Sequence, residues 1–177
     1  FAPAVPVVQD VRWGRTYEGY SENTSVVTEL GEAYVRGLQG ADLTDENSVI
    51  ASAKHYIGDG GTAFGSSKQN IMGVQYLLDQ GDMLVDEATL RELFLPPYEA
   101  AIKAGARTVM ASFSSWRGTK LHMHQYLLTD VLKGELGFRG YVISDWGALD
   151  QLPGAYSAQV AAGINAGVDM VMVPSDY

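Results

Sequence analysis

The chain of 177 residues contains no cysteine, so disulfide bonds and thiolate metal sites are excluded. It also lacks any uninterrupted apolar run near the ~20 residues that a membrane-spanning helix needs, and no membrane partner is expected. Positive charge is scarce, with 12 Lys and Arg against 21 Asp and Glu and a net charge of −9. Because phosphate binding needs clustered Lys and Arg, a nucleic acid is not an expected partner, whereas a neutral substrate is compatible with an acidic surface.

The composition is that of a globular domain with a core, since 46% of the residues are hydrophobic. The chain begins at Phe1, without a Met and already inside an apolar run. We therefore expect a segment whose natural N-terminus lies upstream, and the lack of a visible signal peptide carries no information. Nothing in the sequence calls for a metal ion or another cofactor.

Short apolar, β-branched runs alternate with helical patterns along the chain. The runs do not alternate in polarity, as expected for parallel strands that are buried on both faces. The five predicted strands are Phe1–Val8, Val49–Ile57, Thr108–Ser114, Gly140–Trp146 and Val168–Pro174.

Four helices are predicted between these strands. Asn23 and Thr24 are candidate N-caps of the first, Pro96 and Pro97 should split the second, and Gly137 and Gly167 should close the third and fourth. The predicted buried stripes are Val27, Leu30, Tyr34 and Leu38; Leu90, Leu93, Phe94 and Ala101; Leu128, Val131, Leu132 and Leu136; and Val160, Ala161 and Ile164.

Alternating strands and helices predict an α/β fold with a parallel sheet. Since a closed eight-unit barrel takes about 250 residues, about five strand–helix units fit an incomplete TIM-type (β/α)8 barrel. The alternative is a complete doubly wound sheet of flavodoxin type. The barrel is favoured because no Gly-rich phosphate loop follows the first strand, and because polar residues follow several different strands.

The first candidate site residue is Asp145, at the end of the fourth strand and next to Trp146. A carboxylate there points into the mouth of a barrel, and an indole beside it offers a flat apolar face for a sugar ring. Capping of the following segment is the structural alternative for Asp145.

Further polar residues follow the first two strands. Lys54 and His55 are costly to bury unless they bond to a partner, which is either a sugar hydroxyl or an internal carboxylate. Asp59 follows in a Gly-rich loop, Gly58 to Gln75, that is too long for a simple connector. Arg15 lies in a loop with several acids, where it either orients a substrate or forms a surface ion pair.

Other residues near the predicted strand ends have a structural explanation. His122 and His124 lie two positions apart without an acid pair, so capping or packing explains them better than a metal site. Met110 and Phe113 lie on the third strand and fit a plain core, and Trp116 follows in a loop that could line a cleft.

Several stretches together resemble glycoside hydrolase family 3, in its β-glucosidase and exo-glucanase branch. The resemblance spans almost the whole chain, and its Lys-His and Ser-Asp-Trp blocks are specific in this order. The stretches are Phe1-Ala2-Pro3, Arg12-Trp13-Gly14-Arg15, Tyr17 to Glu22, Ala53 to Tyr56, Gly58 to Thr62, Val109 to Trp116, Leu132-Lys133-Gly134, Leu136-Gly137-Phe138, Gly140 to Trp146, and Ala166 to Met170.

The resemblance implies retaining hydrolysis of terminal β-D-glucosyl residues, with Asp145 as the nucleophile. It further implies that Arg15, Lys54 and His55 bind sugar hydroxyls and that Asp59 supports them. Met110 and Trp146 would line the pocket, and a periplasmic or secreted location is compatible with the family. The acid/base Glu of the family lies on a second α/β domain, and residues 1–177 resemble only part of the N-terminal barrel domain, so we expect the isolated chain to be inactive.

Three positions depart from the family pattern. Phe113 stands where a Tyr is usual, Lys68 where an acid is more typical, and Gln151 where an Arg is often found. The β-N-acetylglucosaminidase branch is disfavoured because Asp59 occupies the position of its second His. A non-catalytic carbohydrate-binding remnant remains the main alternative, and a response-regulator-like module, with Asp145 as a phosphorylation or metal site, is a more distant one.

Overall fold

A computed structural model describes residues 2–174 of the chain. Its centre is a parallel sheet in which β5 lies between β1 and β8. Isolated parallel bridges join Ala4 to Lys54 at one edge and Ile143 to Met170 at the other, so the first and last predicted strands extend the sheet. The central strands are shorter than predicted: β1 (Ser52–Tyr56), β5 (Thr108–Ala111) and β8 (Tyr141–Ile143).

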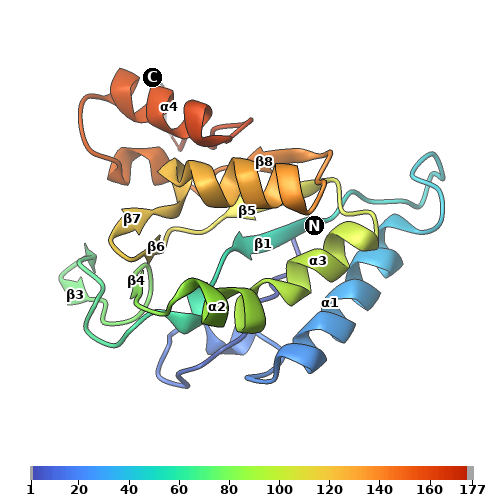
Figure 1. Cartoon of the computed structure of the whole chain (residues 1–177), viewed down its shortest axis with the longest axis horizontal. Helices are drawn as coiled ribbons and strands as arrows, with labels where there is room; N and C mark the ends of the chain where they lie inside the picture. The colour runs from blue at the N-terminus through green and yellow to red at the C-terminus, as the bar shows by residue number, and fades with distance from the viewer. Residues whose placement is uncertain (1, 175–177) are drawn as a thin grey trace.

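The parallel segments lie side by side in the order in which the chain makes them. In a flavodoxin-type sheet the first segment would lie between the second and the third, whereas here the second lies between the first and the third. The doubly wound alternative is therefore wrong, and the fold is part of a (β/α) barrel. Figure 1 shows this progression as a colour change across the molecule, from blue through green and yellow to red.

Helix α1 (Thr24–Gln39) begins where predicted, because the Asn23 side chain accepts hydrogen bonds from the backbone N–H groups of Ser25 and Val26. Thr24 is the first helical residue rather than the cap. The predicted buried face is wrong in part. Leu30 and Tyr34 are 46% and 45% exposed, and the buried positions are Val27, Gly31, Val35 and Gln39.

The buried face of α1 is set by a close approach to the first parallel segment. A Cβ atom at Gly31 would lie 2.8 Å from Cγ1 of Val5. The helix therefore turns Gly31 toward the sheet together with Val27 and Val35, and Leu30 and Tyr34 face outward.

The second predicted helix is split as expected. The side chain of Asp86 accepts from the backbone N–H of Thr89, and the helix is interrupted at Leu95, directly before Pro96. Its pieces are α2 (Glu87–Thr89), the π-helical η3 (Leu90–Phe94) and α3 (Pro96–Lys103), and α3 packs against α1. Among the buried residues are the predicted Leu90, Phe94 and Ala101, and Leu93 packs against the core while partly exposed.

The third predicted helix is the π-helical η5 (Tyr126–Glu135), which buries Leu128, Val131 and Leu132 as expected. It is closed by Gly137, whose φ of 65° lies in the left-handed region that favours glycine. Leu136 packs against the same core but stays partly exposed.

Helix α4 (Tyr156–Ala166) ends at Gly167 as predicted, but its predicted face is wrong. Ala161 and Ile164 are exposed, and Gly163 and Ala166 are buried instead. A Cβ at Gly163 would lie 2.8 Å from Cδ2 of Leu149, so contact with η6 (Ala148–Gln151) selects the small-residue face.

Two small sheets in the loops were not predicted. Strand β4 pairs in parallel with β6, which pairs with β7, and a separate hairpin β2–β3 forms within the long Gly-rich loop. The strands are β2 (Asn70–Ile71), β3 (Val74–Gln75), β4 (Asp82–Met83), β6 (Ser115–Trp116) and β7 (Thr119–Lys120), and the short helices are η1 (Thr16–Glu18), η2 (Asp59–Gly61) and η4 (Leu121–Met123). Over residues 2–174, no helix is long and apolar enough to cross a membrane.

Candidate active site

Three of the predicted site residues meet at the C-terminal ends of neighbouring parallel segments. Nη2 of Arg15 lies 3.2 Å from Nε2 of His55, and the same imidazole nitrogen lies 3.6 Å from Oδ2 of Asp145. Arg15 follows the first segment, His55 lies in β1, and Asp145 follows β8. The sheet order therefore brings a guanidinium, an imidazole and a carboxylate to one place.

His55 is held from its other side by Asp59. The imidazole Nδ1 lies 2.7 Å from Oδ2 of Asp59, and both side chains are buried. Because a guanidinium can only donate, Nε2 of His55 accepts from Arg15, and the ring proton lies on Nδ1, toward Asp59. Asp59 thus holds the His55 ring, and its support of a sugar-binding pocket stays a prediction.

Both oxygens of Asp145 have defined surroundings. Oδ1 accepts a hydrogen bond of 2.7 Å from the backbone N–H of Trp146. Oδ2 is buried and has no hydrogen-bond partner in the described part of the chain. A buried carboxylate oxygen without a partner is costly, and such groups in native structures call for a functional explanation.

Arg15 also forms a forked ion pair with Glu18, with its Nε and Nη2 atoms 2.7 and 2.8 Å from the two carboxylate oxygens. Burial works against the charged guanidinium, but the hydrogen bonds to Glu18 and the charges of Glu18, Asp59 and Asp79 outweigh it and raise the pKa of Arg15. Arg15 is therefore a permanent cation beside His55.

Lys54 faces the same cluster of charges. The pKa of the Glu18 carboxyl is lowered, first by the hydrogen bond from Arg15 and also by the charges of Arg15, Lys54 and His55. Lys54 is half-buried in β1, and the Lys54–His55 and Tyr56–Ile57 peptide bonds are cis. Arg15, Lys54 and His55, which are predicted to hold a sugar, thus all lie near the carboxylate of Glu18.

The remaining predicted residues flank this centre. Met110 lies in β5, partly buried and in register with Ile143 of β8, two residues before Asp145. Trp146 is 62% exposed, directly beside the buried Asp145. Phe113 packs near His122, with 6.1 Å between the ring centroids.

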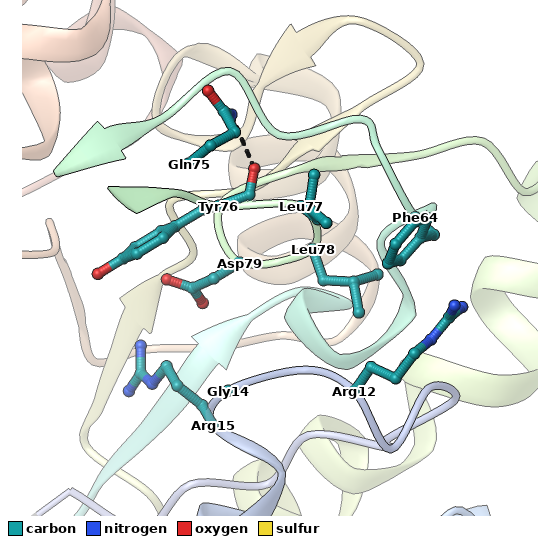
Figure 2. A pocket seen from close by; sticks show the side chains of 9 residues that line it. All are labelled: Arg12, Gly14, Arg15, Phe64, Gln75, Tyr76, Leu77, Leu78 and Asp79. Atoms are coloured by element: carbon teal, nitrogen blue, oxygen red, sulfur yellow. Dashed lines mark hydrogen bonds between the residues drawn. The ribbon is translucent and has the colours of Figure 1, made fainter. Parts of the chain in front are cut away.

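A cavity of about 490 Å³ adjoins the site on the side of Arg15. Figure 2 shows Arg15 and Asp79 on facing walls, with Phe64 and Arg12 at the other end. The guanidinium of Arg12 lies 4.0 Å over the Phe64 ring. The cavity is lined by Arg12, Gly14, Arg15, Phe64, Gln75, Tyr76, Leu77, Leu78 and Asp79. The long Gly-rich loop, Gly58 to Gln75, and the residues directly after it therefore form one of its walls.

A polar network joins three strand-end loops around Gln151. Its Oε1 accepts from Nζ of Lys120 at 2.8 Å and from Nε2 of Gln69 at 3.3 Å, and its Nε2 donates to Gln80 at 2.8 Å. Gln151, one of the three departures from the family pattern, therefore links these loops, and Lys120 is the cation of the network. Lys68, the other departure in this loop, is exposed.

Sequence reasoning missed a contact made by His122. This residue is buried in η4, and its Nε2 accepts a hydrogen bond of 2.9 Å from the backbone N–H of Asp145. Packing was predicted for His122, and the contact with Asp145 was not, because a side-chain bond to a backbone group leaves no spacing pattern. Residues 2–174 contain no group of three or more side chains that could hold a metal ion.

The fold and the site define a segment of a (β/α) barrel that carries a carboxylate and several cations at the C-terminal ends of its strands. Residues 1–177 match the model of the glycosyl hydrolase family 3 N-terminal domain. The chain therefore belongs to glycosyl hydrolase family 3.

Similar proteins have been described as glycosidases. The chain is 47% identical to an exo-1,3/1,4-β-glucanase from a Pseudoalteromonas species, whose crystal structure as a Q683A mutant matches with a TM-score of 0.87 over 99% of this chain and 27% of that chain. It is 37% identical to a β-xylosidase of Formosa agariphila over 93% of this chain and 22% of the relative. It is 34% identical to a periplasmic β-glucosidase of Salmonella typhimurium over 100% of this chain and 22% of the relative, so it spans about a fifth of these curated relatives.

Proposed function

We propose that the protein containing this chain hydrolyses terminal β-D-glucosyl bonds with retention of configuration, and that Asp145 is the nucleophile. The observation that carries this proposal is the environment of the Asp145 carboxylate. One oxygen is fixed by the backbone N–H of Trp146, and the other lies 3.6 Å from His55 without a hydrogen bond among the described residues. An oxygen with free lone pairs is what attack on an anomeric carbon requires.

The cations around the site suit this role. Arg15 and His55 lie in direct contact, and Lys54 acts on the same charge cluster. Hydrogen bonds from charged donors are stronger than those from neutral donors. Arg15 and Lys54 carry donors that fit sugar hydroxyls, and the exposed Trp146 ring offers an apolar face for a pyranose ring.

A retaining mechanism needs a second carboxyl about 5–5.5 Å from the nucleophile, to protonate the leaving oxygen. Asp59 is unsuited, because it is buried and accepts from both the His55 ring and the Gly60 N–H. We propose that residues 1–177 form part of an N-terminal barrel domain, and that further strands and a second α/β domain of the full-length protein supply the acid. β-Glucosides or β-glucan oligosaccharides are the proposed substrates, as for the glucanase and glucosidase relatives.

The test uses the longest natural polypeptide that contains these 177 residues. A 2-deoxy-2-fluoro β-glucoside should label the peptide that carries Asp145, and Asp145→Asn should reduce hydrolysis of an aryl β-glucoside by at least ~10³-fold, as expected for loss of a covalent nucleophile. Asp130→Asn is the matched control, because Asp130 is exposed on η5. Labelling at another residue would overturn the assignment, and binding without labelling would favour the non-catalytic carbohydrate-binding alternative.

A further inference from the structure

His122 connects the nucleophile to a different strand-end loop. It lies in η4, after β5, whereas Asp145 follows β8, and its Nε2 accepts from the backbone N–H of Asp145 at 2.9 Å. The side chain is buried, with 1% of its surface exposed. No solvent molecule can therefore replace the imidazole nitrogen without a rearrangement of the core.

The acceptor role fixes the protonation state of the ring. Nε2 must carry a lone pair to accept, so the ring proton lies on Nδ1, on the side where the backbone of Ser112 forms a hydrogen bond. Burial, followed by the charges of Lys120 and His55, lowers the pKa of His122 to about 3. The imidazole therefore remains an acceptor throughout the neutral and mildly acidic range.

The other contacts of the Asp145 peptide come from its own neighbourhood. Its carbonyl oxygen accepts from the hydroxyl of Ser144 at 2.9 Å and from the backbone N–H of Ala148 at 3.2 Å. Its Oδ1 accepts from the next residue, Trp146. His122 is thus the contact that ties this local turn to the loop after β5.

We propose that His122 is a positioning residue, whose imidazole fixes the Asp145 backbone and thereby holds the carboxylate beside His55 in one orientation. This inference rests on the proposed function of Asp145 as nucleophile. It assigns a role to a residue that touches no reacting atom. An error of about 1 Å in the placement of a reacting group can cost ~100-fold in rate. Loss of the His122 contact can therefore lower the rate measurably if it shifts Asp145 by a similar distance.

The experiment compares two replacements in the longest natural polypeptide that contains this chain. His122→Gln keeps an acceptor at the reach of Nε2, and His122→Met has similar length with only a weak acceptor. We expect the methionine variant to lose ~10- to 100-fold in kcat on an aryl β-glucoside with KM within about threefold of wild type. The glutamine variant should recover most of this loss at an equal thermal unfolding temperature.

The labelling reaction separates this inference from the proposed function. If wild type is labelled at Asp145 and the methionine variant is labelled at the same rate, the positioning role is wrong while the function stands. If the glutamine variant is as slow as the methionine variant although both are folded, the acceptor is not the cause and the inference is also overturned. Absence of labelling in wild type would overturn both. If the methionine variant does not fold, His122→Asn takes its place, because the shorter asparagine side chain cannot bring its amide oxygen to the backbone N–H of Asp145.

Discussion

Arg15 and His55 lie 40 positions apart in the chain and share a contact of 3.2 Å between a guanidinium and an imidazole nitrogen. The contact joins the loop after the first parallel segment to β1, and Asp145 lies on the other side of the same nitrogen, 3.6 Å away. One imidazole nitrogen thus lies between a permanent cation and the proposed nucleophile. The predictions below follow from this arrangement and use the longest natural polypeptide that contains the chain, unless stated otherwise.

Replacement of Arg15 should weaken substrate binding. Arg15→Met removes the donor to His55 and leaves Glu18 without its cation. We expect kcat/KM on an aryl β-glucoside to fall by at least ~100-fold, because a hydrogen bond from a charged group is worth roughly 1.5–3 kcal/mol and its removal leaves partners unpaired. Arg36→Met is the matched control, since Arg36 is an exposed residue of α1 that pairs with Glu32. Equal kinetics for the two variants would contradict the role of Arg15.

Replacement of Asp59 should change the tautomer of His55. In Asp59→Asn the amide oxygen of the new side chain can accept from the backbone N–H of Gly60, so its NH2 group faces Nδ1 of His55. Nδ1 must then accept, and the ring proton moves to Nε2. There it opposes the N–H donor of Arg15. We expect kcat/KM to fall ~10- to 100-fold, and ¹⁵N chemical shifts of the imidazole should report the proton on Nε2. Asp45→Asn, in an exposed turn, is the control. An unchanged tautomer would contradict this account.

Acid should destabilise the fold through His122. Its pKa in the folded state is lowered to about 3, first by burial and then by the charges of Lys120 and His55, whereas the unfolded value is near 6.5. Between these values the unfolded state binds a proton that the folded state does not, so this contribution to stability is lost as the pH falls from about 6.5 to about 3, at up to ~1.4 kcal/mol per pH unit. Thermal unfolding from pH 7 to pH 4 should therefore be less pH-dependent in His122→Gln than in wild type. An equal dependence would contradict the assignment.

The isolated 177-residue chain should not hydrolyse an aryl β-glucoside at a useful rate. The carboxyl groups of Glu18 and Asp59, which lie against Arg15 and His55, are both engaged by those side chains and are unsuited to the acid role. The outward face of α1 carries the exposed Val26, Leu30 and Tyr34. Exposed apolar faces and open strand edges favour aggregation, so light scattering should detect assemblies at micromolar concentration. Turnover near that of the longest natural polypeptide would contradict the proposal that the acid lies outside this chain.

The sequence predicted the places of the parallel segments because each is a nearly continuous apolar run, although the regular strands are shorter than these runs. Helix faces were harder to predict. For α1 and α4 the buried side is the one with glycine, since Gly31 meets Val5 and Gly163 meets Leu149 at distances that leave no room for a larger residue. Hydrophobicity alone selects Leu30 and Ile164 for those faces, and both are exposed. Close backbone approach is a tertiary property that periodicity does not report.

The site could also be predicted only in part from the sequence. Arg15, His55 and Asp145 could be assigned to one place, because they follow parallel segments whose C-terminal ends meet at one edge. The support from His122 could not, because its partner is a backbone N–H and any residue type carries one. The hairpin β2–β3 was missed as well, since its strands of two residues are too short to show a repeating pattern.

The order of the parallel segments has a consequence for biosynthesis. Each segment pairs with the one made just before it, so most sheet contacts join neighbouring parts of the chain and can form while the ribosome is still adding residues. Arg15 and His55 are translated before Asp145, so the segments that carry them are available to pair first. A nascent chain that stops after β5 therefore carries Arg15 and His55 without Asp145, and the three side chains can meet only once β8 has joined the sheet.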